Sequence, residues 1–323
     1  MPAHRMILLY LTAAAMCAMP ASSPTLADDA KSSRKSETAS GPDFSGTWQH
    51  PSFPWFEPPA TGQGPITNLS RWAIQTTDGA GGSPGLPPTT SGGISDYDQL
   101  VGDYKNPILQ PWAAEIVKKF GELSRAGITY PNPSNQCWPY PMPFTYKWTT
   151  VVVLPGKDKI TLHYGGGART VRMNADHPSR LTPSWFGDSV GHYEGDALVI
   201  DTVGVKTDRP YAMQDLFGTP YTDKLHIVER YSLRDYDEVK DALERNAKEN
   251  WLFQGDVFSK HRGKFMQVHV TVEDEGVFTS PFTATITYVP SANPLNEVVC
   301  AENPHEYYNS KDSDVPTAKK PDF

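Results

Sequence analysis

Two β-rich segments carry ionisable side chains at a spacing that suits acid/base chemistry. His226 and Arg230 are four residues apart in the first segment, and His269 and Glu273 have the same spacing in the second. Successive side chains of a strand point to opposite faces, so each pair shares one face of its strand. If both faces point into a cavity, the candidate catalytic groups are His226, His269 and Glu273. Arg230 would then hold a negative charge, and Phe265, on the face of His269, would contact an apolar ligand.

A structural role for the same faces is also open. The other face of the second segment is apolar throughout and is expected to pack a core. The face that holds His269 therefore either lines a polar cavity or lies in solvent, where its groups brace the sheet by cross-strand pairs. His226 and Glu229 lie on opposite faces of their strand, so they form no acid/base pair by themselves. A pairing of either residue with a neighbouring strand stays open.

A cluster of carboxylates precedes the first of these segments. Glu194 and Asp196 flank a glycine, so the chemistry of a tight turn accounts for both. Asp201 lies within an apolar strand and, if buried, needs a cationic partner such as Arg230 or Arg169. The complete set of candidate ligand-binding residues is Arg230, His226, Phe265, Asp201 and Arg169.

The motifs of several other chemistries are missing from the sequence. The run Gly165-Gly166-Gly167 is not followed by GK[ST] and has strands on both sides, which indicates a hairpin turn and not a phosphate loop. The nine histidines show no H-x-H or H-E-x-x-H spacing, and no G-x-S-x-G elbow is present. The net charge of −8, with scattered lysines and arginines, argues against nucleic-acid binding. We expect no metal, no cofactor and no nucleic-acid partner.

Residues 1–27 have the parts of a cleavable export signal. A positively charged start precedes an apolar run over 7–19, and a small-x-small cleavage site occupies 25–27. The run is shorter than the roughly 20 residues that a membrane span needs. We therefore expect a periplasmic or secreted protein that begins at Asp28 and has no membrane span.

Two of the three cysteines, Cys137 and Cys300, remain after removal of the signal. An even pair in an oxidising compartment predicts a disulfide, while two unrelated buried thiols are the alternative. The bond would close a long loop, for which chain entropy gives roughly 4 to 5 kcal/mol of stabilisation.

The rest of the chain is organised as one domain with flexible ends. A polar leader over 28–41 precedes a single β-rich domain over 42–308, and a polar tail follows over 309–323. Within the domain, 51–96 is crowded with proline and glycine and is expected to form a long surface loop.

One helix is expected over 107–125, with Pro111 as an alternative first turn. It is expected to pack on the sheet by the stripe Leu109, Trp112, Ile116, Phe120 and Leu123. A second, short polar helix is expected over Asp237 to Ala247.

Seven short segments after Trp148 are rich in β-branched and aromatic residues and are bounded by turn residues. This pattern predicts a mainly β fold, either an antiparallel up-and-down barrel or a sandwich, with one packed helix and long Pro/Gly-rich loops. A tight turn is expected at Glu194-Gly195. The predicted strands are 149–154, 159–164, 168–173, 197–203, 225–233, 265–273 and 282–289.

Several of these segments resemble a family of exported bacterial proteins of poorly defined function. The resemblance rests on 176–178, 183–189 and 191–204, with later matches at 225–231 and from 272 to 282. The early Ser45-Gly46-Thr47-Trp48 resembles the first strand of lipocalin-like barrels. The chain departs from the family at His192, where arginine is usual, at Tyr193, where tryptophan is usual, and at Glu275, where proline is common.

Three classes of function are compatible with these sequence features. The first is an exported lipocalin-like protein that binds a small apolar or aromatic molecule. The second is a cofactor-independent lyase, isomerase or hydratase that acts on a small aromatic or carbonyl compound in the same cavity. The third is a structural or interaction protein of the cell envelope, with a barrel filled by side chains. Ionisable groups at the floor of a cavity would favour the enzyme, and an apolar cavity would favour the binding protein.

Overall fold

The computed structural model describes residues 41–51, 55–57, 64–72, 94–95, 99–208, 212–249 and 260–292. All of them belong to one compact unit, Glu37–Phe323. The expected signal over 1–27, nearly all of the leader over 28–41, the tail over 309–323 and Cys300 lie outside the described residues. The export signal and the bond between Cys137 and Cys300 therefore stay predictions.

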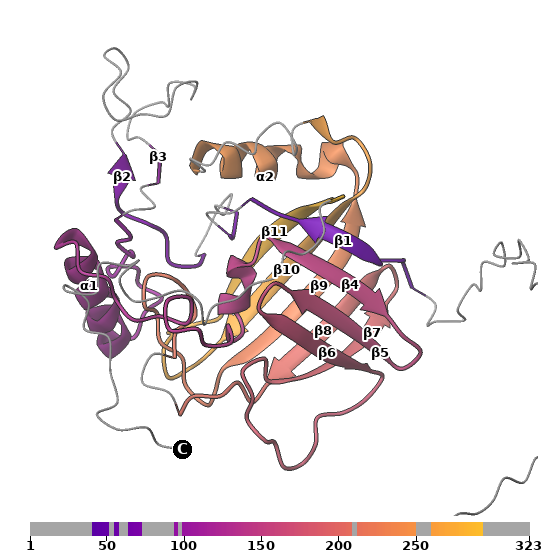
Figure 1. Cartoon of the computed structure of the whole chain (residues 1–323), viewed down its shortest axis with the longest axis horizontal. Helices are drawn as coiled ribbons and strands as arrows, with labels where there is room; N and C mark the ends of the chain where they lie inside the picture. Colours follow the sequence, from indigo (N-terminus) through magenta and orange to yellow (C-terminus); the bar gives the residue numbers. More distant parts are fainter. Residues whose placement is uncertain are drawn as a thin grey trace, which may run out of the picture. The chain divides into compact units, whose positions relative to one another are not determined.

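Nine strands of the described chain form a closed barrel (Figure 1). Their order around the ring is β1-β11-β10-β9-β8-β7-β6-β5-β4, so β1 closes the ring between β11 and β4. The mainly β fold class is confirmed, and of the two expected architectures the barrel is the one formed. The strands are β1 (Gly46–Gln49), β4 (Thr150–Pro155), β5 (Lys159–Tyr164), β6 (Gly167–Met173), β7 (Asp188–Glu194), β8 (Ala197–Val203), β9 (His226–Arg234), β10 (Phe265–Glu273) and β11 (Phe282–Pro290).

The seven predicted strands match the observed β4, β5, β6, β8, β9, β10 and β11 to within one residue at each end. Strand β7 was not predicted, because Gly191 and His192 interrupt its alternation of apolar residues. The expected turns are also present, since the glycine run joins β5 to β6 and Gly195 joins β7 to β8.

The expected antiparallel pairing holds around the barrel except at one place, where β6 and β7 run parallel. Strand directions around a closed ring can alternate at every neighbour only if the number of strands is even. With nine strands, at least one neighbouring pair must be parallel. A parallel pair also needs a long crossover connection, which the segment 174–187 provides.

The inward faces of the strands form the main apolar core. On β10 the predicted apolar face is confirmed as the buried one, and it lies opposite an apolar face of β11. The 3-10 helix η1 (Phe144–Lys147) precedes β4, and its Phe144 and Tyr146 are fully buried. The β10 residues of this core are Met266, Val268, Val270 and Val272.

The helix α1 (Pro111–Arg125) begins at Pro111, the alternative first turn, and not at residue 107. Its buried stripe is Ala113, Val117 and Gly121, whereas Trp112 of the predicted stripe is 45% exposed. A Cβ on Gly121 would fall 2.9 Å from a side-chain atom of Val101, so this small residue allows close approach of the segment before the helix. The predicted stripe is therefore wrong at Trp112, while Leu109 is buried in the main core and Phe120 packs against it.

The helix α2 (Tyr236–Glu249) confirms the second expected helix. It lies along the outside of the barrel beside β11 (Figure 1). Val239 packs there with Phe265 and Val289 in a second, smaller apolar cluster. The inside and the outside of β10 and β11 are thus both covered over part of their length.

The described parts of the Pro/Gly-rich segment 51–96 include the paired strands β2 (Arg71–Trp72) and β3 (Ile94–Ser95). Trp55 and Ile66 are buried in the main core. The expectation that the whole segment runs over the surface is therefore wrong for these residues, because their large apolar side chains pack against the barrel core.

Candidate functional site

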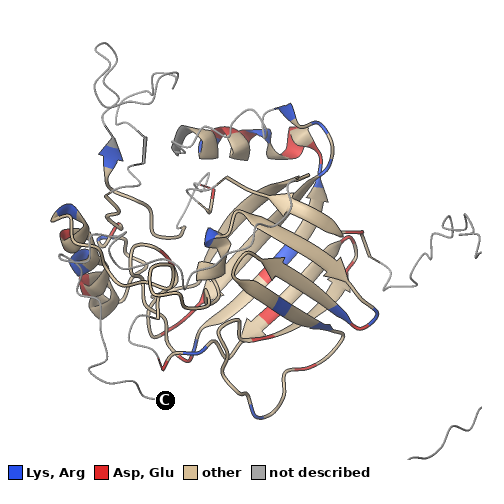
Figure 2. Cartoon of the chain, in the orientation of Figure 1, with Lys and Arg blue, Asp and Glu red and all other residues tan. Residues whose placement is uncertain are grey.

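The interior of the barrel holds an ion pair between two strands that are not neighbours. Most of the barrel ribbon carries neither Lys and Arg nor Asp and Glu (Figure 2). Arg169 on β6 and Glu229 on β9 are both fully buried. Nη1 of Arg169 donates to Oε1 of Glu229 at 3.0 Å, and Nη2 donates to Oε2. This two-pronged contact is the strong form of an arginine–carboxylate pair.

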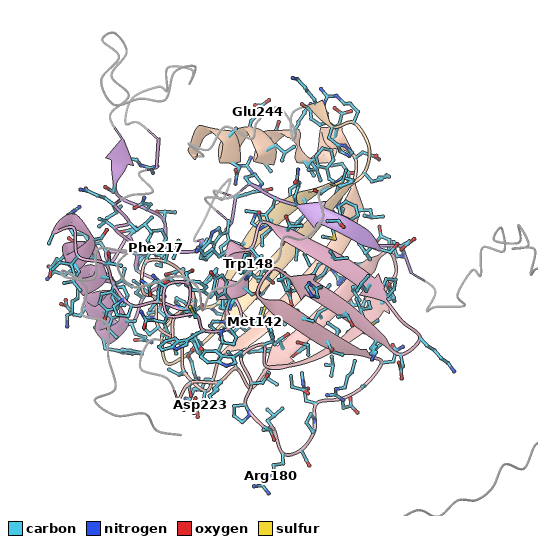
Figure 3. The ribbon with its side chains drawn as sticks, viewed as in Figure 1. Met142, Trp148, Arg180, Phe217, Asp223 and Glu244 are labelled. Atoms are coloured by element: carbon cyan, nitrogen blue, oxygen red, sulfur yellow. The ribbon has the colours of Figure 1, made fainter. Side chains whose placement is uncertain are left out.

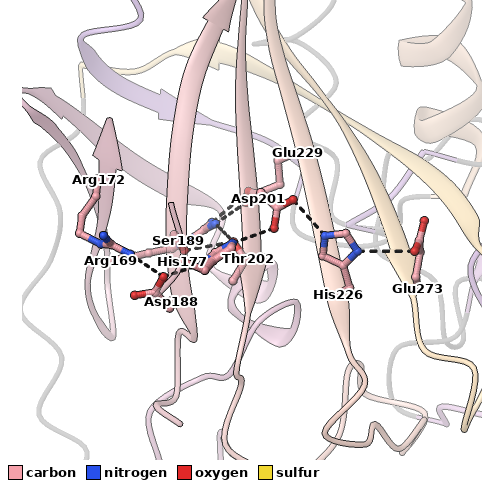
Figure 4. A network of polar contacts seen from close by, with 10 residues as sticks. All are labelled: Arg169, Arg172, His177, Asp188, Ser189, Asp201, Thr202, His226, Glu229 and Glu273. Carbon is pink, nitrogen blue, oxygen red and sulfur yellow. Dashed lines mark hydrogen bonds and ion pairs between the residues drawn. The ribbon is translucent and has the colours of Figure 1, made fainter. Parts of the chain in front are cut away.

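The remaining polar atoms of the pair have partners as well. The hydroxyls of Tyr146 and Tyr231 donate to Oε1 of Glu229 at 2.5 and 2.9 Å. Nε of Arg169 donates to the Ser189 hydroxyl at 2.9 Å, and Nη2 also donates to a threonine hydroxyl at 2.6 Å. A buried ion pair is tolerated when such bonds satisfy it. We call this set the inner network: Tyr146, Arg169, Ser189, Thr202, Glu229 and Tyr231 (Figure 4 shows part of it).

Electrostatics keep the two phenols and the guanidinium of the inner network in one protonation state. Burial raises the pKa of Tyr146 and of Tyr231 well above the usual value, and the charge of Glu229 adds to the rise. Burial alone would lower the pKa of Arg169, but the Glu229 carboxylate outweighs this effect and raises it. The phenols therefore stay donors and the guanidinium stays charged at neutral pH. Such a set braces the barrel and moves no proton.

A second polar network crosses the outer wall of the barrel (Figure 4). His177, from the crossover, contacts Asp188 through Nδ1 at 2.6 Å and Asp201 through Nε2 at 3.0 Å. His226 contacts the other oxygen of Asp201 through Nε2 at 3.0 Å and Glu273 through Nδ1 at 3.5 Å. An arginine on β6 extends the row by bonding Asp188 at 2.7 Å. We call this set the outer ladder: Arg172, Asp188, His177, Asp201, His226 and Glu273.

Each imidazole of the outer ladder lies between two carboxylates. A doubly protonated ring donates from both nitrogens, so the two carboxylates beside His226 favour its imidazolium form. The hydrogen bond to Asp201 is the main cause that raises the pKa of His226, and the same bond lowers the pKa of Asp201. Within the outer ladder, the contact between His226 and Asp201 therefore depends on pH.

The structure does not bring the predicted cavity residues into the barrel. His226, Arg230, His269 and Glu273 lie on the outward faces of β9 and β10, while Glu229 and the apolar face of β10 point inward. The sequence left an inward and an outward placement of these residues open, and the inward one is wrong. The physical reason is that the opposite faces carry the larger apolar groups, and Glu229 is accommodated because Arg169 is buried with it.

The other predicted partners are also rearranged. Asp201 binds His177 and His226, and neither of the two arginines expected as partners. Arg230 instead donates from both of its Nη atoms to Oε2 of Glu194 on the exposed wall, at 2.7 and 2.6 Å. Each of the two expected arginines is therefore paired with another carboxylate, Arg169 with Glu229 and Arg230 with Glu194.

Two further predicted site residues, Phe265 and His269, lie on the outward face of β10. Nδ1 of His269 is hydrogen-bonded to Thr285 at 3.0 Å, and burial is the main cause that lowers its pKa. Phe265 is covered by α2 and packs edge-to-face with His261. Of the three catalytic candidates, His226 and Glu273 are close together, and His269 lies apart from them along the same strand as Glu273.

A third polar site, which no sequence motif had indicated, lies at the end of η1. Nζ of Lys147 donates to the Ser134 hydroxyl at 2.6 Å and lies 5.5 Å from the centre of the Tyr140 ring. Burial alone lowers the pKa of Lys147 to about 8, and no ion pair of the described residues includes it. We call Ser134, Tyr140, Lys147 and Trp148 the lysine site.

The Tyr140 ring beside this lysine belongs to a cluster of aromatic rings. Tyr140 stacks on Trp148 at 5.0 Å and packs edge-to-face on Phe144 at 5.2 Å. Figure 3 shows Trp148 among the dense side chains between the barrel strands and α1. Trp148 lies over the turn at Gly165, where a Cβ would fall 2.6 Å from its ring. The sequence signal that could have revealed the site is the density of aromatic residues and prolines over 130–148.

No family model, no curated protein and no solved structure matches the chain. The resemblance to a family of exported proteins therefore remains a prediction. Among the described residues, no group of three or more His, Cys, Asp or Glu is arranged to hold a metal ion. Within the same residues, no helix has both the length and the apolar character that crossing a membrane requires.

We predict that the inner network is a large contributor to stability. Glu229→Gln removes the charge that compensates Arg169, and breaking a buried pair in this way costs about 3 to 5 kcal/mol in the free energy of unfolding. Urea unfolding measures the change. The double variant Arg169→Met/Glu229→Met should recover part of the loss, while Arg230→Ala, which breaks an exposed pair, should cost about 1 kcal/mol or less. A Glu229→Gln protein as stable as the parent would contradict this assignment.

We also predict that the outer ladder stabilises the fold mainly between about pH 4 and 6.5. The raised pKa of His226 gives a contribution that is complete below the ordinary value of 6.5 and is lost as pH rises through the raised value. The lowered pKa of Asp201 gives a contribution that is present above 3.8 and is lost as pH falls through the lowered value.

The measurement is the free energy of unfolding of the parent and of His226→Gln across this range. The difference between them should be largest within the window and should shrink towards pH 8. His192→Gln, which breaks one exposed pair with Glu194, is the matched control and should cost about 1 kcal/mol or less. A difference that does not change with pH would show that His226 acts by packing alone.

Proposed function

We propose that the protein is an exported binding protein for a small aromatic molecule that carries an anionic or carbonyl group. The observation that carries the proposal is the ammonium of Lys147, which lies among aromatic rings and has no carboxylate partner among the described residues. Lys147 is partly buried, and a charge that has lost part of its hydration favours a ligand that supplies the opposite charge or an acceptor. Aromatic walls with a few placed polar groups are typical of small-molecule sites.

The two other polar networks support this choice by contrast. The guanidinium of Arg169 is already bonded to Glu229, Ser189 and Thr202, so a ligand would have to displace bonds that the chain itself makes. Arg230 and Asp201 are likewise paired on the outer wall. The ligand site is therefore proposed at Lys147 and no longer at the residues first expected from strand alternation.

The enzymatic alternative, a cofactor-independent lyase, isomerase or hydratase, draws its support from the outer ladder. Two of its candidate groups, His226 and Glu273, form a partly exposed ion pair at 3.5 Å. Their place on the outer wall offers no aromatic surroundings comparable to those of Lys147. Binding at the lysine site is therefore the better supported function, and conversion of the bound probe is monitored in its test.

Export and the disulfide belong to the same proposal. They are supported by the signal-like residues 1–27 and by the even pair Cys137 and Cys300. Protein collected from the periplasm of a bacterial host should have the intact mass of a chain that starts at Asp28, less two hydrogens. Reduction should restore those two hydrogens. A mass that includes the first 27 residues would refute export, and an unchanged mass on reduction would refute the disulfide.

The ligand prediction is tested with benzoate as the anionic probe and benzyl alcohol as its uncharged counterpart. Quenching of tryptophan fluorescence should saturate with benzoate, because Trp148 lies beside the lysine. Lys147→Met should weaken benzoate binding by about tenfold or more, the worth of a charge-assisted hydrogen bond, and should affect benzyl alcohol less.

Lys118→Met is the control for this experiment, since Lys118 is on the exposed side of α1 beside Glu115. It should leave both affinities unchanged. Equal benzoate affinity in the parent and in Lys147→Met would remove the lysine site from the proposal. NMR of the probe after long incubation should show no conversion, and conversion that depends on His226 would favour the enzyme.

A further inference from the structure

Lys147 has the surroundings of a lysine that reacts with carbonyl compounds. An imine-forming lysine needs an amine that is partly neutral, a group that moves protons, and a wall that holds the carbonyl compound. The lysine site supplies each of these from a different residue. The inference rests on the proposed function, because it names the ligand class that the same site would take.

The amine is the first requirement. Lys147 lies at the last position of η1 and faces the Ser134 hydroxyl and the Tyr140 ring, and no carboxylate of the described residues pairs with it. Because burial lowers its pKa to about 8, about a tenth of the amine is neutral at pH 7. This fraction is about 300-fold larger than for a lysine with the ordinary pKa of 10.5.

The proton-moving group is Ser134. Its hydroxyl lies 2.6 Å from Nζ of Lys147, which is hydrogen-bond distance. The turn that carries it is fixed, because its backbone N–H donates to Oδ1 of Asn132 at 2.9 Å while the Asn132 N–H donates to Oδ1 of Asn135 at 2.8 Å. The hydroxyl can accept a proton from the nitrogen and donate one to an adjacent oxygen, as a relay requires.

The wall is the stack of Tyr140 on Trp148, with an interplanar angle of 20°. The edge-to-face contact with Phe144 and the glycine turn beneath Trp148 hold both rings in place. An aryl group prefers offset-stacked or edge-to-face contact with such rings. With Tyr140 only 5.5 Å from Nζ, an aryl ring placed against it would bring a carbonyl carbon on that ring near the amine.

We propose that Lys147 captures aromatic aldehydes and ketones as a reversible imine, with Ser134 relaying the protons. The lone pair of Nζ adds to the carbonyl carbon, and a proton passes from nitrogen to the former carbonyl oxygen through Ser134. The carbon–oxygen bond then breaks, the oxygen leaves as water with a second proton from the nitrogen, and the carbon–nitrogen double bond remains. One amine and one carbonyl compound give one imine and one water, with no oxidation or reduction.

Reductive trapping tests the inference on the full exported chain. The protein is mixed with benzaldehyde and cyanoborohydride at pH 7, and peptide mapping by mass spectrometry locates the benzyl adduct. We expect the adduct at Lys147 to form at least tenfold faster than at Lys118, which is the exposed reference lysine in the same molecule. An adduct spread evenly over the lysines would overturn the proposal.

Two variants separate the parts of the mechanism. Lys147→Arg keeps the positive charge but has no nucleophilic amine, so it should bind benzoate and lose the adduct at this position. Ser134→Ala should slow trapping by about tenfold or more at saturating benzaldehyde, where weaker binding is no longer the cause. An unchanged trapping rate in Ser134→Ala would remove Ser134 from the proposal.

Different results would refute the binding proposal and the imine proposal. If benzoate binds at Lys147 but benzaldehyde is not trapped there, the imine is refuted and the binding function stands. If neither probe reaches the site, both are refuted. If Lys147→Arg shows a lower melting temperature than the parent, the comparison of Lys147 with Lys118 in the parent chain still decides the question.

Discussion

A closed ring of nine strands cannot alternate direction at every neighbour, and much of the structure follows from this constraint. The parallel contact falls between β6 and β7, which share three register pairs where β7 and β8 share seven. Of the three contacts between neighbouring strands from β6 to β9, this one has the fewest paired residues. Both polar networks cross it, the inner one from Arg169 to Ser189 and the outer one from Arg172 to Asp188. We infer that the two networks compensate for the weak seam.

The inner network and the outer ladder stabilise the contact between β6 and β7 with different electrostatics. The inner network is buried and rich in hydrogen bonds, and its two phenols and its guanidinium keep one protonation state near neutral pH. The outer ladder is partly exposed and built on imidazoles, so its contribution depends on pH. The crossover over 174–187, which the parallel pair requires, also brings His177 to the ladder. The odd number of strands therefore requires both the parallel pair and the crossover, and the crossover carries His177, which helps to stabilise that pair.

Local sequence pattern predicted the strands well and the site poorly, for a physical reason. Alternation tells which residues share a face, as on β9, but it does not tell which face is inside when both faces carry a charge. That choice depended on Arg169 of a distant strand being buried with Glu229. β7 was missed because Gly191 and His192 interrupt its apolar pattern. Lys147 was missed because η1 is too short to show a period.

The position of Lys147 depends in turn on the barrel interior. Tyr146, the residue before it, is fully buried and donates to Glu229, so η1 is tied to the inner network by its third residue. In a 3-10 helix, successive side chains point about a third of a turn apart. With Tyr146 directed inward, Lys147 is directed away from the interior and towards Ser134 and Tyr140. The hydrogen bond from Tyr146 to Glu229 in the barrel interior therefore also fixes the position of Lys147 at its edge.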